Sequence, residues 1–292
     1  IQLAKPLERL LASQVDYKEW YDLRIEAMLL QSHMHSSPLR GMLGARVGLI
    51  PHQFYIAHEV GKRVAPRVLL ADEVGLGKTI EAGLILHQQL KTGRSERILI
   101  LVPDSLQYQW MIEMRRRFNL QFSLFDLTRT ASIKEHDPDQ NPFLTEQCII
   151  ASVDLMVDHE DLREQALAAG FDLLVVDEAH HLMWSEEEGG NDRYDLDDEL
   201  AQQTAGVLLL TATPEQLGVE SHFARLRLLD PQRFSSLERF LDEEQQYQQT
   251  AKVAEVLMSD EALAEDHLIA LDGLLGHRID DNPEQRMRAI HE

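Results

Sequence analysis

Short apolar runs alternate with longer amphipathic stretches between about residues 49 and 231. The apolar runs are continuous in Val, Ile and Leu and do not alternate with polar residues, which is typical of strands buried on both faces of a parallel sheet. Six such strands are predicted, over residues 67–71, 97–102, 122–125, 147–151, 173–176 and 207–210.

Helical spacing of apolar residues predicts helices between these strands, over residues 80–91, 106–118, 162–169 and 220–228. Strands alternating with helices indicate an α/β fold of the doubly wound class, with a central, mostly parallel sheet and helices on both faces. Ligands of such folds bind at the carboxyl ends of the strands.

The two flanks lack this strand pattern. Residues 1–48 are predicted to form a helical linker, residues 49–231 one lobe, and residues 232–292 an acidic helical appendage or the start of an inter-lobe region. The chain begins with Ile1 and not with methionine, so we expect a segment of a longer protein.

Composition narrows the class of protein. The chain has 292 residues, 44% of them hydrophobic, but no apolar run of the ~20 residues that span a bilayer, so a soluble protein without membrane contact is expected. A single cysteine cannot form an internal disulfide and fits a reducing, cytoplasmic location. The single cysteine, Cys148, lies in an apolar run and is expected to pack in the core. A net charge of −22 argues against a chain that binds nucleic acid over its whole surface. A local basic face remains open, because bases gather at Lys62, Arg63, Arg94, Arg97, Arg115, Arg116 and Arg117.

A phosphate-binding loop is predicted after the first strand. The sequence DEVGLGKT stands between that strand and a helix, the context that a P-loop requires. Glycines let the backbone N–H groups turn towards phosphate oxygens, the lysine supplies positive charge, and the threonine hydroxyl suits Mg²⁺. The candidate ATP-binding residues are Asp72, Glu73, Val74, Gly75, Leu76, Gly77, Lys78 and Thr79.

The loop departs from the common pattern at Asp72, where a glycine is usual. The alternative interpretation is an ordinary glycine turn followed by a solvated lysine.

A second cluster follows the strand at 173–176, namely the DEAH box Asp177, Glu178, Ala179 and His180. Asp177 is expected to hold Mg²⁺, through water, and Glu178 to polarise the attacking water, so that with Lys78 they form the candidate catalytic set. A solvated acidic turn is the alternative. His180 either couples the ATP site to the next motif or caps the turn.

Three weaker candidates remain. Small residues follow the last strand, namely Thr211, Ala212 and Thr213. We expect them to hydrogen-bond to the DEAH box and to signal whether the γ-phosphate is present. The alternative is a plain turn. Gln53 has an amide that suits the edge of adenine.

The segment after the second strand is a candidate for holding a nucleic-acid backbone, through Pro103, Ser105 and Gln107. The alternative is a capped amphipathic helix with Trp110 in the core, and for Trp110 itself we favour the core.

Taken in order, these motifs resemble the motor of helicase superfamily two. DEVGLGKT with DEAH resembles its Swi/Snf branch, which also accounts for Asp72. Residues 70–83, 173–182 and 208–229 are most similar to bacterial members of that branch that associate with RNA polymerase, and the resemblance covers roughly residues 1–240.

The resemblance implies the first of two RecA-like lobes, with ATP and Mg²⁺ as cofactors. It implies movement on double-stranded DNA without strand separation, and RNA polymerase as the partner that is released and recycled; RNA stays an alternative to DNA. Two other hypotheses remain: a nucleotide-binding fragment with negligible turnover, because the second lobe and its arginine finger have no counterpart in this sequence, and a lobe of a true helicase.

Overall fold

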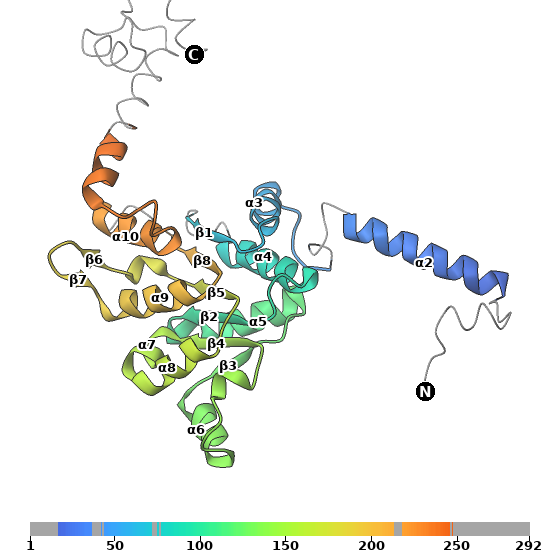
Figure 1. The fold of residues 1–292 in the computed structure, drawn as a ribbon, viewed down its shortest axis with the longest axis horizontal. Coiled ribbons are helices and arrows are strands. Elements are labelled where there is room, and N and C mark those ends of the chain that lie inside the picture. Colours follow the sequence, from blue (N-terminus) through green and yellow to red (C-terminus); the bar gives the residue numbers. More distant parts are fainter. Residues whose placement is uncertain are drawn as a thin grey trace, which may run out of the picture. The chain divides into compact units, whose positions relative to one another are not determined.

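A six-stranded parallel sheet forms the centre of the chain in the computed structural model, which describes residues 17–36, 42, 44–71, 75, 77–212, 218–245 and 247 (Figure 1). The strand order is β1-β8-β5-β2-β4-β3, and all five pairings are parallel. The six predicted strands are confirmed, each end lying within one residue of its predicted position. Their bounds are Arg67–Leu70 (β1), Ile98–Val102 (β2), Ser123–Phe125 (β3), Cys148–Ser152 (β4), Leu173–Val176 (β5) and Gly206–Leu210 (β8).

Three helices share one hydrophobic core with one face of the sheet: α3 (Pro51–Gly61), α4 (Lys78–Thr92) and α5 (Gln107–Phe118). The sheet contributes alternate residues such as Ile98, Ile100 and Val102, all fully or almost fully removed from solvent. The residues between them, Leu99 and Leu101, are equally buried and face the other way, because successive side chains of a strand point to opposite faces.

Helices α7 (Val153–Asp158) and α8 (Glu160–Ala168) lie on the opposite side of the sheet from α4 and α5 (Figure 1). Their buried residues are Val153 and Met156 in α7, and Leu162 and Ala166 in α8. The predicted arrangement of helices on both faces is therefore confirmed. Cys148 packs against the core as expected, and burial raises the pKa of its thiol to about 11, so the thiol stays protonated.

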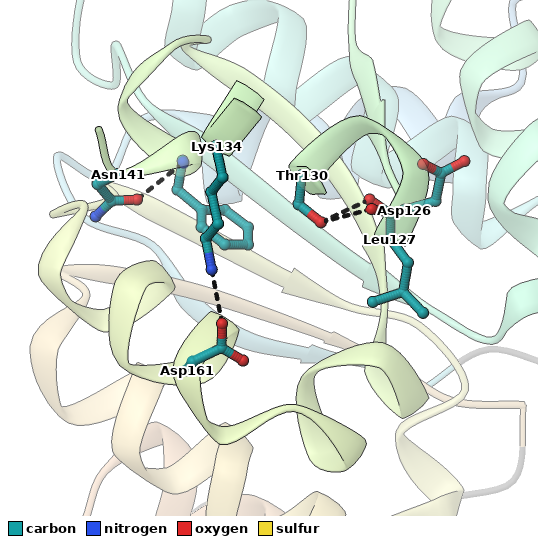
Figure 2. Close-up of polar contacts among 7 residues, drawn as sticks. Asp126, Leu127, Thr130, Lys134, Asn141 and Asp161 are labelled. Atoms are coloured by element: carbon teal, nitrogen blue, oxygen red, sulfur yellow. Dashed lines mark hydrogen bonds and ion pairs between the residues drawn. The ribbon is translucent and has the colours of Figure 1, made fainter. Parts of the chain in front are cut away.

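Helix α6 (Leu127–His136) was not predicted, because its sequence is polar and lacks an apolar stripe. It forms through local hydrogen bonds: the Asp126 carboxylate accepts from the backbone N–H of Arg129 at 2.7 Å. The Lys134 ammonium group pairs with Asp161 of α8 at 2.7 Å (Figure 2). Arg129 of the same helix pairs with Glu146 at 2.8 Å, so the helix is held by capping and two ion pairs more than by burial.

The chain divides into two compact units, residues 1–178 with 199–212, and residues 179–198 with 213–292. The second unit contains the hairpin of β6 (Trp184–Ser185) and β7 (Gly189–Gly190), and α10 (Val219–Leu229). Trp184 and Phe223 pack with ring centroids 5.6 Å apart. Helix α9 (Asp192–Gln203), like the hairpin, was not predicted.

The flanks are described in part. The predicted N-terminal linker contains α2 (Lys18–Ser36), and the side chains described in it, those of residues 17–32, are all exposed. The predicted appendage is helical over 237–245 and at 247, and residues 246 and 248–292 lie outside the described residues. Among the helices that the structure describes, none is both long and apolar enough to span a membrane.

Candidate nucleotide-binding site

The predicted motifs converge because their strands end at one edge of the sheet. Leu70 of β1 is level with Leu210 of β8, and Val176 of β5 with Leu209. The backbone N–H of Thr211 donates to the carbonyl of Leu70 at 3.0 Å. The P-loop, the DEAH box and the segment after β8 therefore all leave the sheet at the same edge.

The end of the P-loop has the backbone conformation of an anion-binding turn. Gly75 and Gly77 have φ angles of 90° and 93°, a region that favours glycine. Gly77 is the N-cap of α4, so Lys78 and Thr79 form the first turn, where free N–H groups and the helix dipole attract anions. Asp72, Glu73, Val74 and Leu76 lie outside the described residues.

Gln53 lies against this loop, although 24 residues of sequence separate it from Gly77. Its side chain is 3% exposed on α3. A Cβ atom added to Gly77 would come within 2.5 Å of the Gln53 Nε2 atom. The glycine at this position therefore makes room for the Gln53 amide.

Asp177 is held through both carboxylate oxygens. The indole Nε1–H of Trp110 donates to Oδ2 at 2.7 Å, and the backbone N–H of Glu178 donates to Oδ1 at 2.9 Å. Burial raises the pKa of Asp177 above its ordinary value, while these two hydrogen bonds and the charge of Lys78 act in the opposite direction. The charge of Lys78 thus acts on Asp177, and the two residues follow strands β1 and β5, which end at the same edge of the sheet.

Glu178 has a φ angle of 53°, in the left-handed region that side chains other than glycine's seldom adopt. Such strain persists where the surroundings enforce it and is frequent at functional sites. The chain then enters the second unit with the short helix Ala179–His181, in which the rings of His180 and His181 lie 4.0 Å apart.

The residues fit a Mg²⁺–nucleotide pair. Among the described residues, none has an atom within 4 Å of the place where a Cβ of the left-handed Gly75 would stand. Thr79 carries a hydroxyl on the first turn of α4, and Asp177 is a half-buried carboxylate under the influence of Lys78. Oxygen ligands of this kind suit Mg²⁺, and the lysine suits phosphate.

The remaining candidates occupy different positions. Thr211 is buried and Ala212 half-buried, while Thr213 lies outside the described residues. Pro103 begins a short helix in which Ser105 is exposed, and the Gln107 amide donates to Asp104 at 3.0 Å. The basic residues are elsewhere: Arg115, Arg116 and Arg117 form the last turn of α5, at the far end from Gln107.

The sequence interpretation missed one polar contact of this site. It assigned Trp110 to the core, and the side chain is indeed only 1% exposed. A buried indole usually finds an acceptor for its N–H, and that acceptor is Asp177. The sequence does indicate that a buried tryptophan needs an acceptor for its indole N–H. It does not tell which residue is that acceptor.

Comparison with known proteins identifies the family. Residues 54–267 match the model of the SNF2-related domain. The chain belongs to the SNF2-related family. Its fold agrees with that of a solved SWI2/SNF2 ATPase core from Sulfolobus solfataricus in complex with double-stranded DNA, with a TM-score of 0.53, 21% identity, and coverage of 65% of this chain and 37% of that chain.

The same archaeal ATPase core domain, solved by itself, gives a TM-score of 0.52 at 19% identity over 65% of this chain and 36% of that one. The predicted RecA-like lobe is therefore confirmed as the fold of this SNF2-related chain.

The curated relatives are bacterial. The chain is 56% identical over 266 residues to the RNA polymerase-associated protein RapA of Vibrio cholerae serotype O1 (strain M66-2), and 55% identical to RapA of Vibrio campbellii. Each match covers 91% of this chain and 27% of the relative, so the chain spans about a quarter of the length of these proteins. The predicted resemblance to polymerase-associated members of the Swi/Snf branch is thereby confirmed.

Proposed function

We propose that this chain is the first motor lobe of an ATP-dependent translocase that moves on double-stranded DNA in the cytoplasm and acts on RNA polymerase, stimulating its release and recycling in transcription. Within it, residues 49–231 would be the ATP-binding lobe. The observation that supports the proposal is that Lys78, at the start of α4, and Asp177, after β5, lie at the same edge of the sheet, where the charge of Lys78 acts on the Asp177 carboxylate.

Each residue then has a defined task. The P-loop backbone and Lys78 bind the β- and γ-phosphates, and Gln53 hydrogen-bonds the edge of adenine. Thr79 and Asp177 hold Mg²⁺, which neutralises charge on the phosphates. Glu178 orients the attacking water and accepts its proton.

The proposal that polymerase and DNA are the partners rests on two likenesses. Relatives at 55–56% identity are named RNA polymerase-associated proteins, and the SWI2/SNF2 core of similar fold was solved with double-stranded DNA. Pro103, Ser105 and Gln107 are the candidate contacts with the nucleic-acid backbone. RNA in place of DNA remains an alternative substrate that the same assays address.

A second candidate concerns the chain taken alone: a nucleotide-binding segment with negligible turnover. Lys78 is the cation whose charge lowers the pKa of Asp177, and it belongs to the P-loop itself. Related nucleotidases gain about 10³- to 10⁵-fold in rate from an additional arginine. The chain spans 27% of the relatives, which leaves room for that arginine elsewhere in a longer protein.

The test compares ATP hydrolysis by this chain and by the full-length protein, each with and without double-stranded DNA. We expect strong DNA stimulation of the full-length protein, its loss in Lys78→Ala, and little turnover by the chain alone. A full-length protein whose hydrolysis ignores DNA would refute the translocase. Strong stimulation of the chain alone would refute the second candidate.

Two further assays separate the remaining alternatives. Displacement of a triplex-forming strand without separation of the duplex is expected of a translocase, whereas separation of the duplex itself would indicate a true helicase. Capture of purified RNA polymerase by the full-length protein tests the proposed partner, and no capture at micromolar concentrations would refute it.

A further inference from the structure

The indole N–H of Trp110 makes a polar contact that packing of the ring in the core does not require. Helix α5 buries Trp110, Met114 and Phe118 against the sheet, one helical turn apart. Of these three, Trp110 also reaches the carboxylate of Asp177, at 2.7 Å. The residue thus joins the core of the lobe to the candidate Mg²⁺ site.

We propose that Trp110 is a positioning residue for ATP hydrolysis, which orients the Asp177 carboxylate towards the Mg²⁺ and nucleotide through its indole N–H. This inference rests on the proposed function, because it assigns a role within that same site. The inference adds to the proposed function a residue outside the P-loop and the DEAH box. The geometry of the metal-binding carboxylate depends on that residue.

The geometry supports this role because each oxygen of Asp177 has its own donor. Trp110 fixes Oδ2 from α5, and the backbone N–H of Glu178 fixes Oδ1 from within the loop. A carboxylate held at both oxygens cannot rotate about its terminal bond without losing a hydrogen bond. Partners of this kind orient metal ligands, and their removal commonly costs about 10- to 100-fold in activity or metal affinity.

The donor at Oδ2 comes from a rigid element, whereas the donor at Oδ1 does not. Trp110 is 1% exposed and packed within the hydrophobic core, so its ring has little freedom. Glu178 belongs to a loop and has a strained φ angle of 53°. The indole is therefore the fixed reference against which Asp177 is oriented.

The variant Trp110→Phe removes the N–H donor and keeps an aromatic ring in the core. In the full-length protein we expect kcat to fall about 10- to 100-fold and the Mg²⁺ concentration for half-maximal rate to rise, with the Kd for nucleotide measured without metal unchanged. The matched control is Met114→Leu, a buried residue of the same helix face without a polar contact at Asp177. If Trp110 acts only through packing, Trp110→Phe and Met114→Leu should lower kcat alike. Neither should then change the Mg²⁺ concentration for half-maximal rate.

A second measurement needs no turnover, no metal and no variant of Trp110. With ¹⁵N-labelled tryptophan, the three indole N–H signals of this chain can be followed by NMR. The Trp110 signal is expected to be protected from solvent exchange, and the substitution Asp177→Ala should shift it and speed its exchange. The signal of Trp20, which is 64% exposed, serves as the internal reference.

The outcomes separate this inference from the function beneath it. A full-length wild type that hydrolyses no ATP refutes the proposed function, whatever Trp110 does. If the wild type is active and Trp110→Phe matches it in kcat and in Mg²⁺ dependence, the positioning role is wrong and the proposed function stands. An indole signal that Asp177→Ala leaves in place overturns the inference even if the Phe variant fails to fold.

Discussion

Replacing Gly77 by alanine tests how Gln53 and the P-loop depend on each other. The added Cβ would stand 2.5 Å from the Gln53 Nε2 atom, closer than non-bonded atoms approach. Because this atom ends a flexible side chain, we expect the amide to move and not the backbone. Gly77→Ala should therefore displace the group proposed to contact adenine.

The matched control is Gly75→Ala, two residues earlier. The two glycines have nearly equal φ angles, 90° and 93°, so both substitutions carry a similar backbone strain of about 1–2 kcal/mol. An added Cβ at Gly75 would have no atom of the described part of the chain within 4 Å. The difference between the variants therefore isolates the displacement of Gln53.

The magnitude follows from the hydrogen bonds of one amide. A donor and an acceptor on adenine contribute about 0.5–1.5 kcal/mol each, so Gly77→Ala should weaken ATP binding by about 1–3 kcal/mol more than Gly75→Ala does, or roughly 5- to 150-fold in Kd. Titration with fluorescent ATP and GTP analogues measures this. Preference for ATP over GTP should fall in Gly77→Ala and in Gln53→Ala, but not in Gly75→Ala.

Equal losses of affinity in the two glycine variants would refute this reasoning. So would a Gly77→Ala variant that keeps its preference for ATP, because the amide would then not be the group that recognises the base.

Three further predictions concern the reaction and the two units. Glu178→Gln should bind ATP like the wild type but cleave it about 10²- to 10⁴-fold more slowly in single turnover, and normal cleavage would exclude Glu178 as the base. Gly83→Ala places a Cβ 2.2 Å from the buried ring of Phe118 and should cost about 1–3 kcal/mol in urea unfolding; a change within 0.5 kcal/mol would contradict this packing. Burial raises the pKa of Asp197 to about 8, far above that of an unfolded chain, so the folded state binds the extra proton and loses stability as pH rises between these pKa values. In the wild type this group should lower the free energy of unfolding by about 1.4 kcal/mol for each pH unit between pH 5 and 7, and Asp197→Asn should abolish that contribution. Parallel curves of unfolding free energy against pH for the two proteins would refute it.

The sheet was predictable because its strands are buried on both faces. A strand such as Leu173–Val176 is a short unbroken apolar run, the pattern typical of strands in a parallel sheet. The strands in turn fixed where the P-loop and the DEAH box begin. The class of fold therefore predicts that Lys78 and Asp177 lie at the same edge of the sheet, and the strand order and register agree with that.

The helix and the side-chain contacts that the sequence did not predict depend on interactions that leave no periodic pattern in the sequence. Helix α6 depends on the cap by Asp126 and the ion pair of Lys134 with Asp161, which lies 27 residues further along the chain. The contact between Gln53 and Gly77, and that between Trp110 and Asp177, join residues brought together only by packing of helices on the sheet. Sequence patterns predict such helices but not which side chains meet between them.

The central claim is that Lys78 and Asp177 form one site for the phosphates and the metal. Calorimetric titration of Mg²⁺–ATP into this chain and into its Lys78→Ala variant tests that claim most directly. The account predicts binding by the wild type and a Kd roughly 10- to 150-fold weaker in the variant, since a charge-assisted hydrogen bond contributes about 1.5–3 kcal/mol. Equal affinity of the two proteins for Mg²⁺–ATP would contradict it.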